Sequence, residues 1–88
     1  MKVYIVIQNL EEWGADPKVF SSMRKAQLYI KELIADEIVC RMDNDDKEKK
    51  ISDLFYSIEY IEGTNNINYV QYDKEGKDYI CLDEREVE

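Results

Sequence analysis

The stretch Val3-Tyr4-Ile5-Val6-Ile7 decides the fold prediction, because it is a continuous run of β-favouring residues without polar alternation. Such a run is typical of a strand that is covered on both faces, usually an interior strand of a sheet. We therefore predict a first strand over residues 3–8, inside a sheet. All other elements are expected to pack around it.

A turn and a helix are predicted to follow this strand. Residues 9–17 contain Gly14 and the pair Asp16-Pro17, which indicates an acidic turn or loop around Trp13, before a short second strand at 18–20. Ser21 or Ser22 is a good N-cap for a helix over 22–41, since its hydroxyl can accept a hydrogen bond from a first-turn amide. The apolar residues of this segment recur at steps of three and four, and they are Met23, Ala26, Tyr29, Ile30, Leu33, Ile34, Ile38 and Met42.

The second half of the chain is predicted to be a charged connector followed by strands. Residues 43–53 are almost purely polar and indicate a solvated connector, whereas 54–62, 67–73 and 78–83 are typical of an antiparallel meander with turns between them. The acidic tail 84–88 has too little apolar content to require order. One α+β domain over 1–88 is therefore expected, a mostly antiparallel sheet of four to five strands with one amphipathic helix.

The charge of the chain bounds the class of its partners. Lysine and arginine number 12 and aspartate and glutamate number 20, which gives a net charge of −8. Such a surface repels phosphate backbones and anionic membranes, so we expect neither direct nucleic-acid binding nor membrane binding. Residues 54–88 hold nine acids and only three bases, so a basic partner is expected to meet that part.

Composition also indicates a compartment and a source. Cys40 and Cys81 fit no metal or redox spacing, which is typical of reduced residues in a reducing compartment. The apolar run at 3–7 is too short for a signal peptide or a membrane span, so a cytoplasmic protein is expected. The excess of Lys, Ile, Asn, Asp, Glu and Tyr favours an AT-rich genome, such as that of a low-GC bacterium or its phage.

No catalytic set can be assembled from the sequence, so we expect a protein that is not an enzyme and needs no cofactor. The chain has no histidine, and its three glycines are isolated, which disfavours triads, zinc sites and phosphate loops. The acids at 43–46 fail the EF-hand pattern and lie among lysines, so a solvated charge run is favoured over a cation site. Glu11 and Glu12 are adjacent on an extended segment and indicate an exposed acidic loop with Trp13 over the core edge, not a catalytic pair.

Seven tyrosines are the most informative feature for function, and five of them lie in the predicted meander. Because strand residues alternate between faces, these five cannot all point at one helix-covered core. Tyrosine among carboxylates makes a good protein-binding surface, although β-propensity alone also explains tyrosine in strands. The residues predicted to bind a partner are Glu59, Tyr60, Glu62, Tyr69, Tyr72, Asp78 and Asp83.

The first third of the chain resembles the start of many small uncharacterised bacterial and phage proteins. The likeness lies in the opening strand, the acidic turn through Trp13-Gly14, the step Val19-Phe20-Ser21-Ser22 and the amphipathic helix. The resemblance implies a compact β-α unit and no catalytic residue.

Three functions follow as hypotheses. The first is an acidic inhibitor from a phage or mobile element, an anti-defence protein or DNA mimic that occupies a basic surface of a host nucleic-acid-binding or defence protein. The second is a homo-oligomer that sequesters a nucleotide-type signal in a pocket between subunits, lined by tyrosines and by Arg24, Lys25 or Lys31. The third is an accessory subunit of a larger complex. Oligomerisation is expected because a core of this size is thin.

Overall fold

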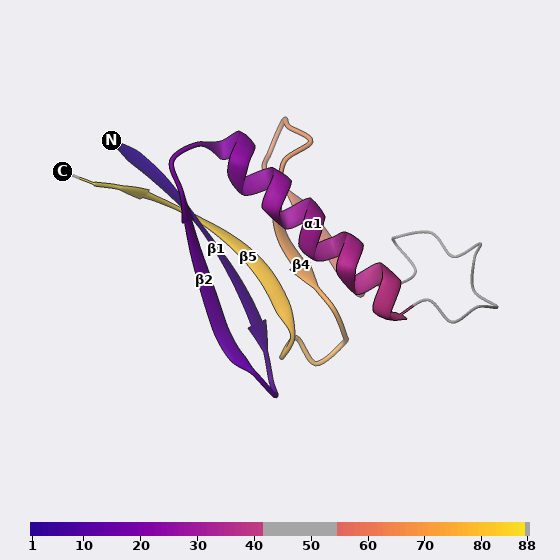
Figure 1. Cartoon of the computed structure of the whole chain (residues 1–88). Coiled ribbons are helices and arrows are strands. Elements are labelled where there is room, and N and C mark those ends of the chain that lie inside the picture. Colours follow the sequence, from indigo (N-terminus) through magenta and orange to yellow (C-terminus); the bar gives the residue numbers. More distant parts are fainter. Residues whose placement is uncertain (42–54, 88) are drawn as a thin grey trace.

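The computed structural model describes residues 1–41 and 55–87 and has an α+β fold, as predicted. A single α-helix packs against one face of a five-stranded antiparallel sheet (Figure 1). The elements in chain order are β1 (Lys2–Leu10), β2 (Gly14–Phe20), α1 (Met23–Arg41), β3 (Ser57–Tyr60), β4 (Ile67–Gln71) and β5 (Tyr79–Glu86). The connector predicted at 43–53 lies outside the described residues.

The strand order is β2-β1-β5-β4-β3, so β1 lies inside the sheet, as its continuous apolar run predicts. It pairs with β2 on one side and with β5 on the other, both antiparallel. The meander of β3, β4 and β5 is also confirmed. The last strand therefore closes the sheet against the first, through the pairs Ile7 with Cys81 and Val6 with Leu82.

The second strand is longer than its sequence suggests. It begins at Gly14 instead of residue 18 and includes Pro17, which pairs with Ile7. Proline cannot donate a hydrogen bond to a neighbouring strand, but β2 is an edge strand and the missing donor faces outward at no cost. Gly14 has a φ of 79°, a value that L side chains rarely adopt, and it ends the tight turn after β1.

The last strand extends through most of the predicted acidic tail. Residues 84–86 belong to β5, where Glu84 pairs with Tyr4 and Glu86 with Lys2 in the sheet register. The Lys2 ammonium lies 3.3 Å from the Glu84 carboxylate, and the N-terminal ammonium of Met1 lies 3.2 Å from the Glu86 carboxylate. Order here comes from pairing with β1 and not from apolar content, which is why composition alone did not predict it.

The helix begins where the N-cap predicts. The amide of Lys25 donates to the Ser22 hydroxyl at 3.2 Å, which satisfies one amide that no helical carbonyl can reach. The buried face of α1 is formed by Ala26, Ile30 and Ile34, each at most 6% exposed. The helix thus contributes one apolar stripe to the core and leaves its other faces in solvent.

The core lies between α1 and the facing side of the sheet. The fully buried strand residues Val6, Val70 and Ile80 come from three adjacent strands. Tyr72 and Phe55 extend this core beyond β4 and β3, with ring centroids 5.4 Å apart. Within residues 1–41 and 55–87, no helix is long and apolar enough to cross a membrane.

Candidate functional site

The face of the sheet opposite α1 carries no second layer in the part of the chain that the structure describes (Figure 1). We call it the open face. Strand residues alternate between the two faces, so the neighbours of Val6 and Ile80 in sequence point to this side. Its members by register are Ala15, Pro17, Val19, Val3, Ile5, Ile7, Asn9, Tyr79, Cys81, Asp83, Arg85, Tyr69, Gln71, Ser57 and Glu59.

A row of cross-strand neighbours runs through the centre of the open face. Ile7 pairs with Cys81, Cys81 with Tyr69, and Tyr69 with Glu59. Directly beside this row, Tyr69 stacks on Tyr79 with ring centroids 5.8 Å apart and an interplanar angle of 29°. The stack joins β4 to β5 and places two rigid aromatic side chains near the middle of the face.

Burial among these neighbours changes the titration of two groups. Burial raises the pKa of the Tyr69 phenol, and Tyr79, Glu59 and Cys81 raise it further. Burial likewise raises the pKa of the Cys81 thiol, with a second contribution from Asp83. The thiol therefore stays protonated at neutral pH, which makes it a poor nucleophile or metal ligand. The structure has Cys81 half-buried on the open face.

The charged residues of the open face are few. Arg85 donates from Nε to the Asp83 carboxylate at 2.7 Å, which neutralises the pair. The remaining charge of the face is the exposed Glu59. The face is thus largely uncharged in a chain whose net charge is −8, and most of the carboxylates lie elsewhere.

The structure brings only part of the predicted partner-binding set together. Glu59, Tyr69 and Asp83 share the open face. Tyr72 is 3% exposed, its ring packs against Phe55 in the core, and its hydroxyl accepts a hydrogen bond from Nε2 of Gln8 at 3.3 Å. No partner can contact it there, so it is removed from the candidate surface. Strand alternation is consistent with this position, since Tyr72 follows the buried Val70 by two residues and lies on the same side of the sheet.

The other predicted residues lie at separate positions. Tyr60 is 56% exposed on the edge strand β3, after a register shift between Glu59 and Tyr60. Glu62 is exposed in the turn between β3 and β4. Asp78 accepts a hydrogen bond from the backbone amide of Glu11 at 2.8 Å, which ties the β4–β5 turn to the β1–β2 turn. Its role in the described structure is to join two turns.

The acidic turn around Trp13 differs from expectation in one respect. Trp13 is 82% exposed and does not fold over the core edge. A shallow pocket of about 230 Å³ next to it is lined by residues that include Glu11, Glu12, Glu37 and Asp78. The ammonium of Lys77 lies 3.3 Å from the Glu11 carboxylate and partly neutralises the group. No group of three or more metal-ligating side chains occurs among the described residues, and the acids at 43–46 lie outside them.

Both edges of the sheet are unsuited to pairing with another strand. The β2 edge contains Pro17, and the β3 edge is only four residues long with a register shift near its end. Proline, short length and irregularity are the features by which natural sheets prevent edge-to-edge association. The two edges of the sheet therefore disfavour the addition of a further strand.

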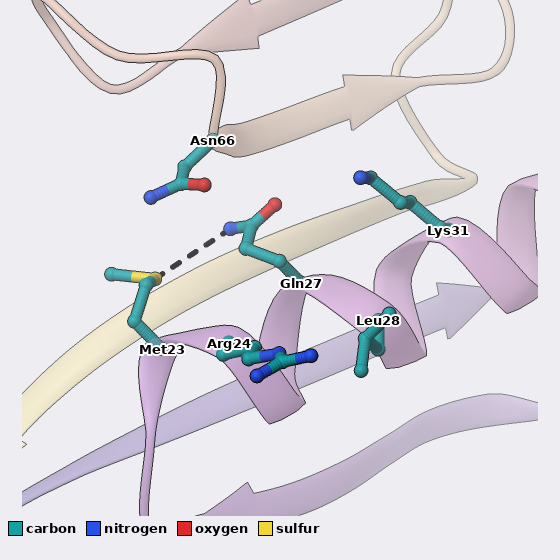
Figure 2. Close-up of a pocket in the computed structure, with 6 residues that line it drawn as sticks. All are labelled: Met23, Arg24, Gln27, Leu28, Lys31 and Asn66. Carbon is teal, nitrogen blue, oxygen red and sulfur yellow. Dashed lines mark hydrogen bonds between the residues drawn. The ribbon is translucent and has the colours of Figure 1, made fainter.

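The second candidate site is a pocket beside the helix (Figure 2). We call it the helix pocket, a cavity of about 350 Å³ lined by Met23, Arg24, Gln27, Leu28, Lys31 and Asn66. Two of the three bases that the sequence suggested for a ligand site, Arg24 and Lys31, line it within one chain, while Lys25 does not. The spacing of 24, 27, 28 and 31 follows one helix face and is visible in the sequence, but the opposing Asn66 is not.

The chain matches no protein-family model, no curated protein and no solved structure, so both sites are interpreted from their own geometry.

Proposed function

We propose that this chain is a non-enzymatic protein-binding domain, and that its open face docks on a partner surface with an apolar centre and a rim of lysine and arginine. The observation that carries the proposal is the uncovered apolar part of the open face, where Ile7 lies opposite Cys81 and diagonal to Tyr79 of the Tyr69–Tyr79 stack, with Ile5 next on the same face of β1. Apolar and aromatic side chains of this kind dominate the centres of protein interfaces.

The open face is smaller than one side of a standard protein interface. Strands of nine, seven, four, five and eight residues, at about 3.3 Å per residue and about 4.8 Å between strands, give the face roughly 500 Å². A standard interface buries about 800 Å² on each partner. A stable partner therefore has to extend past the sheet onto the surrounding turns.

Those turns determine the charge of the partner. Glu62, Asp73 and Glu75 are exposed in the turns that flank β4, and Glu59 lies at the margin of the face itself. A partner that covers the face would bring its own rim near these carboxylates, and basic side chains are complementary to them. Two copies of a chain with a net charge of −8 repel each other, so a heterologous basic partner is favoured over a second copy at this face.

Within this proposal, the simplest biological role is that of an inhibitor. A small acidic domain that covers a basic surface blocks whatever anion that surface normally binds. Nucleic-acid-binding or defence proteins of a bacterial host are the target class that matches this chemistry, and a phage or mobile element is the corresponding source.

The test is affinity capture from a low-GC bacterial lysate at low and high salt, with matched pairs of variants. Tyr69→Ala and Glu59→Lys alter the open face, whereas Tyr60→Ala and Glu32→Lys, the latter on an exposed position of α1, make the same chemical changes away from it. We expect one stoichiometric basic protein to be retained at low salt, released at high salt, lost with the first pair and retained with the second.

Capture that is equally affected by both pairs would contradict the open face as the docking surface. Sedimentation velocity of the purified chain tests the competing occupant, since a homodimer abolished by Tyr69→Ala would show that a second copy takes this face. A homodimer that persists in both Tyr69→Ala and Glu59→Lys would instead form through a surface other than the open face.

A further inference from the structure

The helix pocket has one wall on α1 and the other on the turn that leads into β4. Figure 2 shows Arg24, Gln27, Leu28 and Lys31 on successive turns of the helix, with Asn66 facing them from the start of the strand. Arg24 and Lys31 are seven positions apart, so their backbones lie about 10 Å apart along the helix axis. The pocket between them is about 350 Å³, within the range of small-molecule sites.

Gln27 fixes these two walls in position. Its Nε2 donates to the carbonyl of Ile67 at 2.9 Å, and its Oε1 accepts from the amide of Ile67 at 2.9 Å. A longer contact of 3.7 Å joins the same Nε2 to the sulfur of Met23, drawn as the dashed line in Figure 2. Gln27 is 6% exposed, and these contacts occupy its amide, so it holds the pocket together and leaves ligand binding to its neighbours.

The charge of the pocket is opposite to that of the chain. Arg24 and Lys31 both line it, none of the six lining residues is acidic, and neither base forms a salt bridge with a side chain in the described ranges 1–41 and 55–87. At physiological ionic strength, charges more than about 8 Å apart are largely screened. The local pair of cations therefore decides which ligands are attracted, despite the overall charge of −8.

We propose that the helix pocket binds a small organic phosphate of nucleotide size. Arg24 and Lys31 contact its phosphoryl oxygens, Asn66 hydrogen-bonds its polar edge, and Leu28 with Met23 contacts its less polar part. Arginine and lysine are the side chains that bind phosphoryl groups best, and two of them lining one pocket suit a ligand with more than one anionic oxygen group. This site is on the helix side of the molecule and is independent of the open face.

The test is isothermal titration calorimetry of the purified chain at low salt with three probes, namely ADP, inorganic pyrophosphate and adenosine. We expect ADP to bind, pyrophosphate to bind more weakly, and adenosine to give no heat. Arg24→Ala and Lys31→Ala should each weaken ADP binding by at least about tenfold, because each removes a charge-assisted hydrogen bond. Lys25→Ala removes the same charge from a helix residue outside the pocket, and it should change affinity less than about twofold.

Three outcomes would overturn the proposal. The first is absence of binding of ADP and pyrophosphate at millimolar concentration. The second is a loss of ADP affinity with Lys25→Ala that equals the loss with Arg24→Ala or Lys31→Ala. Equal affinity of ADP and pyrophosphate would refute the apolar contacts with Leu28 and Met23. The variant Arg24→Lys keeps the charge and the helix propensity, so a partial loss with this variant separates phosphate contact from misfolding.

Discussion

The two faces of the same sheet differ in how they are covered, although β1 contributes apolar residues to both. On the helix side, Val6 and Ile80 of the sheet are fully buried in one core with Ile30 of α1. On the open face, Ile5 and Ile7 are half-buried by their strand neighbours alone. An apolar strand therefore does not specify what covers it, and the uncovered half of β1 is where the protein has apolar surface available for a partner.

The largest expected effect compares truncation of one isoleucine on each face. Ile30→Ala removes a fully buried side chain and leaves a cavity, so the free energy of unfolding should fall by about 3 kcal/mol. Ile7→Ala removes a half-buried side chain that solvent can reach, and the loss should be about 1 kcal/mol. Urea denaturation of both variants measures the difference. Equal losses would mean that the open face is covered in solution.

The next effect concerns the contact that joins the helix to β4. Gln27→Leu keeps the volume but leaves the amide and carbonyl of Ile67 without their side-chain partner, which should cost about 2 kcal/mol. Hydrogen exchange at the Ile67 amide should accelerate along with this loss. Unchanged exchange at Ile67 would contradict the role of Gln27 as the link between α1 and the sheet.

The smallest effect is a dependence of stability on alkaline pH. The pKa values of Tyr69 and Cys81 are raised above the ordinary 10.0 and 9.0, chiefly because burial disfavours the charged forms. Their stabilising contribution is therefore complete below those ordinary values and is lost as pH rises through the raised ones. Melting temperature should fall above about pH 9, and Cys81→Ser with Tyr69→Phe should flatten the decline. A decline that is unchanged in the double variant would assign it to other groups.

Sequence patterns predicted the elements whose signals are local. The run at 3–7, the Ser22 cap and the helical spacing of Ala26, Ile30 and Ile34 each predicted an element that the structure contains. Sequence patterns were wrong where local preference and long-range pairing disagree. Pro17 and the residues 84–86 disfavour a strand by composition, yet pairing with β1 holds both segments in the sheet.

The candidate sites also contain some residues that sequence patterns identify and others that only the structure places. Glu59, Tyr69 and Asp83 were found because strand alternation puts one set of meander residues away from a helix-covered core. Ile5 and Ile7 were missed as members of that surface, since a continuous apolar run indicates burial on both sides. In the helix pocket, spacing can group Arg24 with Lys31, but nothing in the sequence places Asn66 opposite them.

By itself, the sequence determined the α+β class, the interior position of the first strand, the start of the helix and the acidic charge, because periodicity, capping and composition act over a few residues. Only the tertiary structure decided that β5 pairs with β1, that α1 covers one face and leaves the other open, and that Gln27 joins the helix to Ile67. These features depend on contacts between segments about 40 to 80 residues apart. Such contacts form only when the free energy of burying the whole core exceeds the entropy cost of closing the chain, and no local pattern encodes that sum.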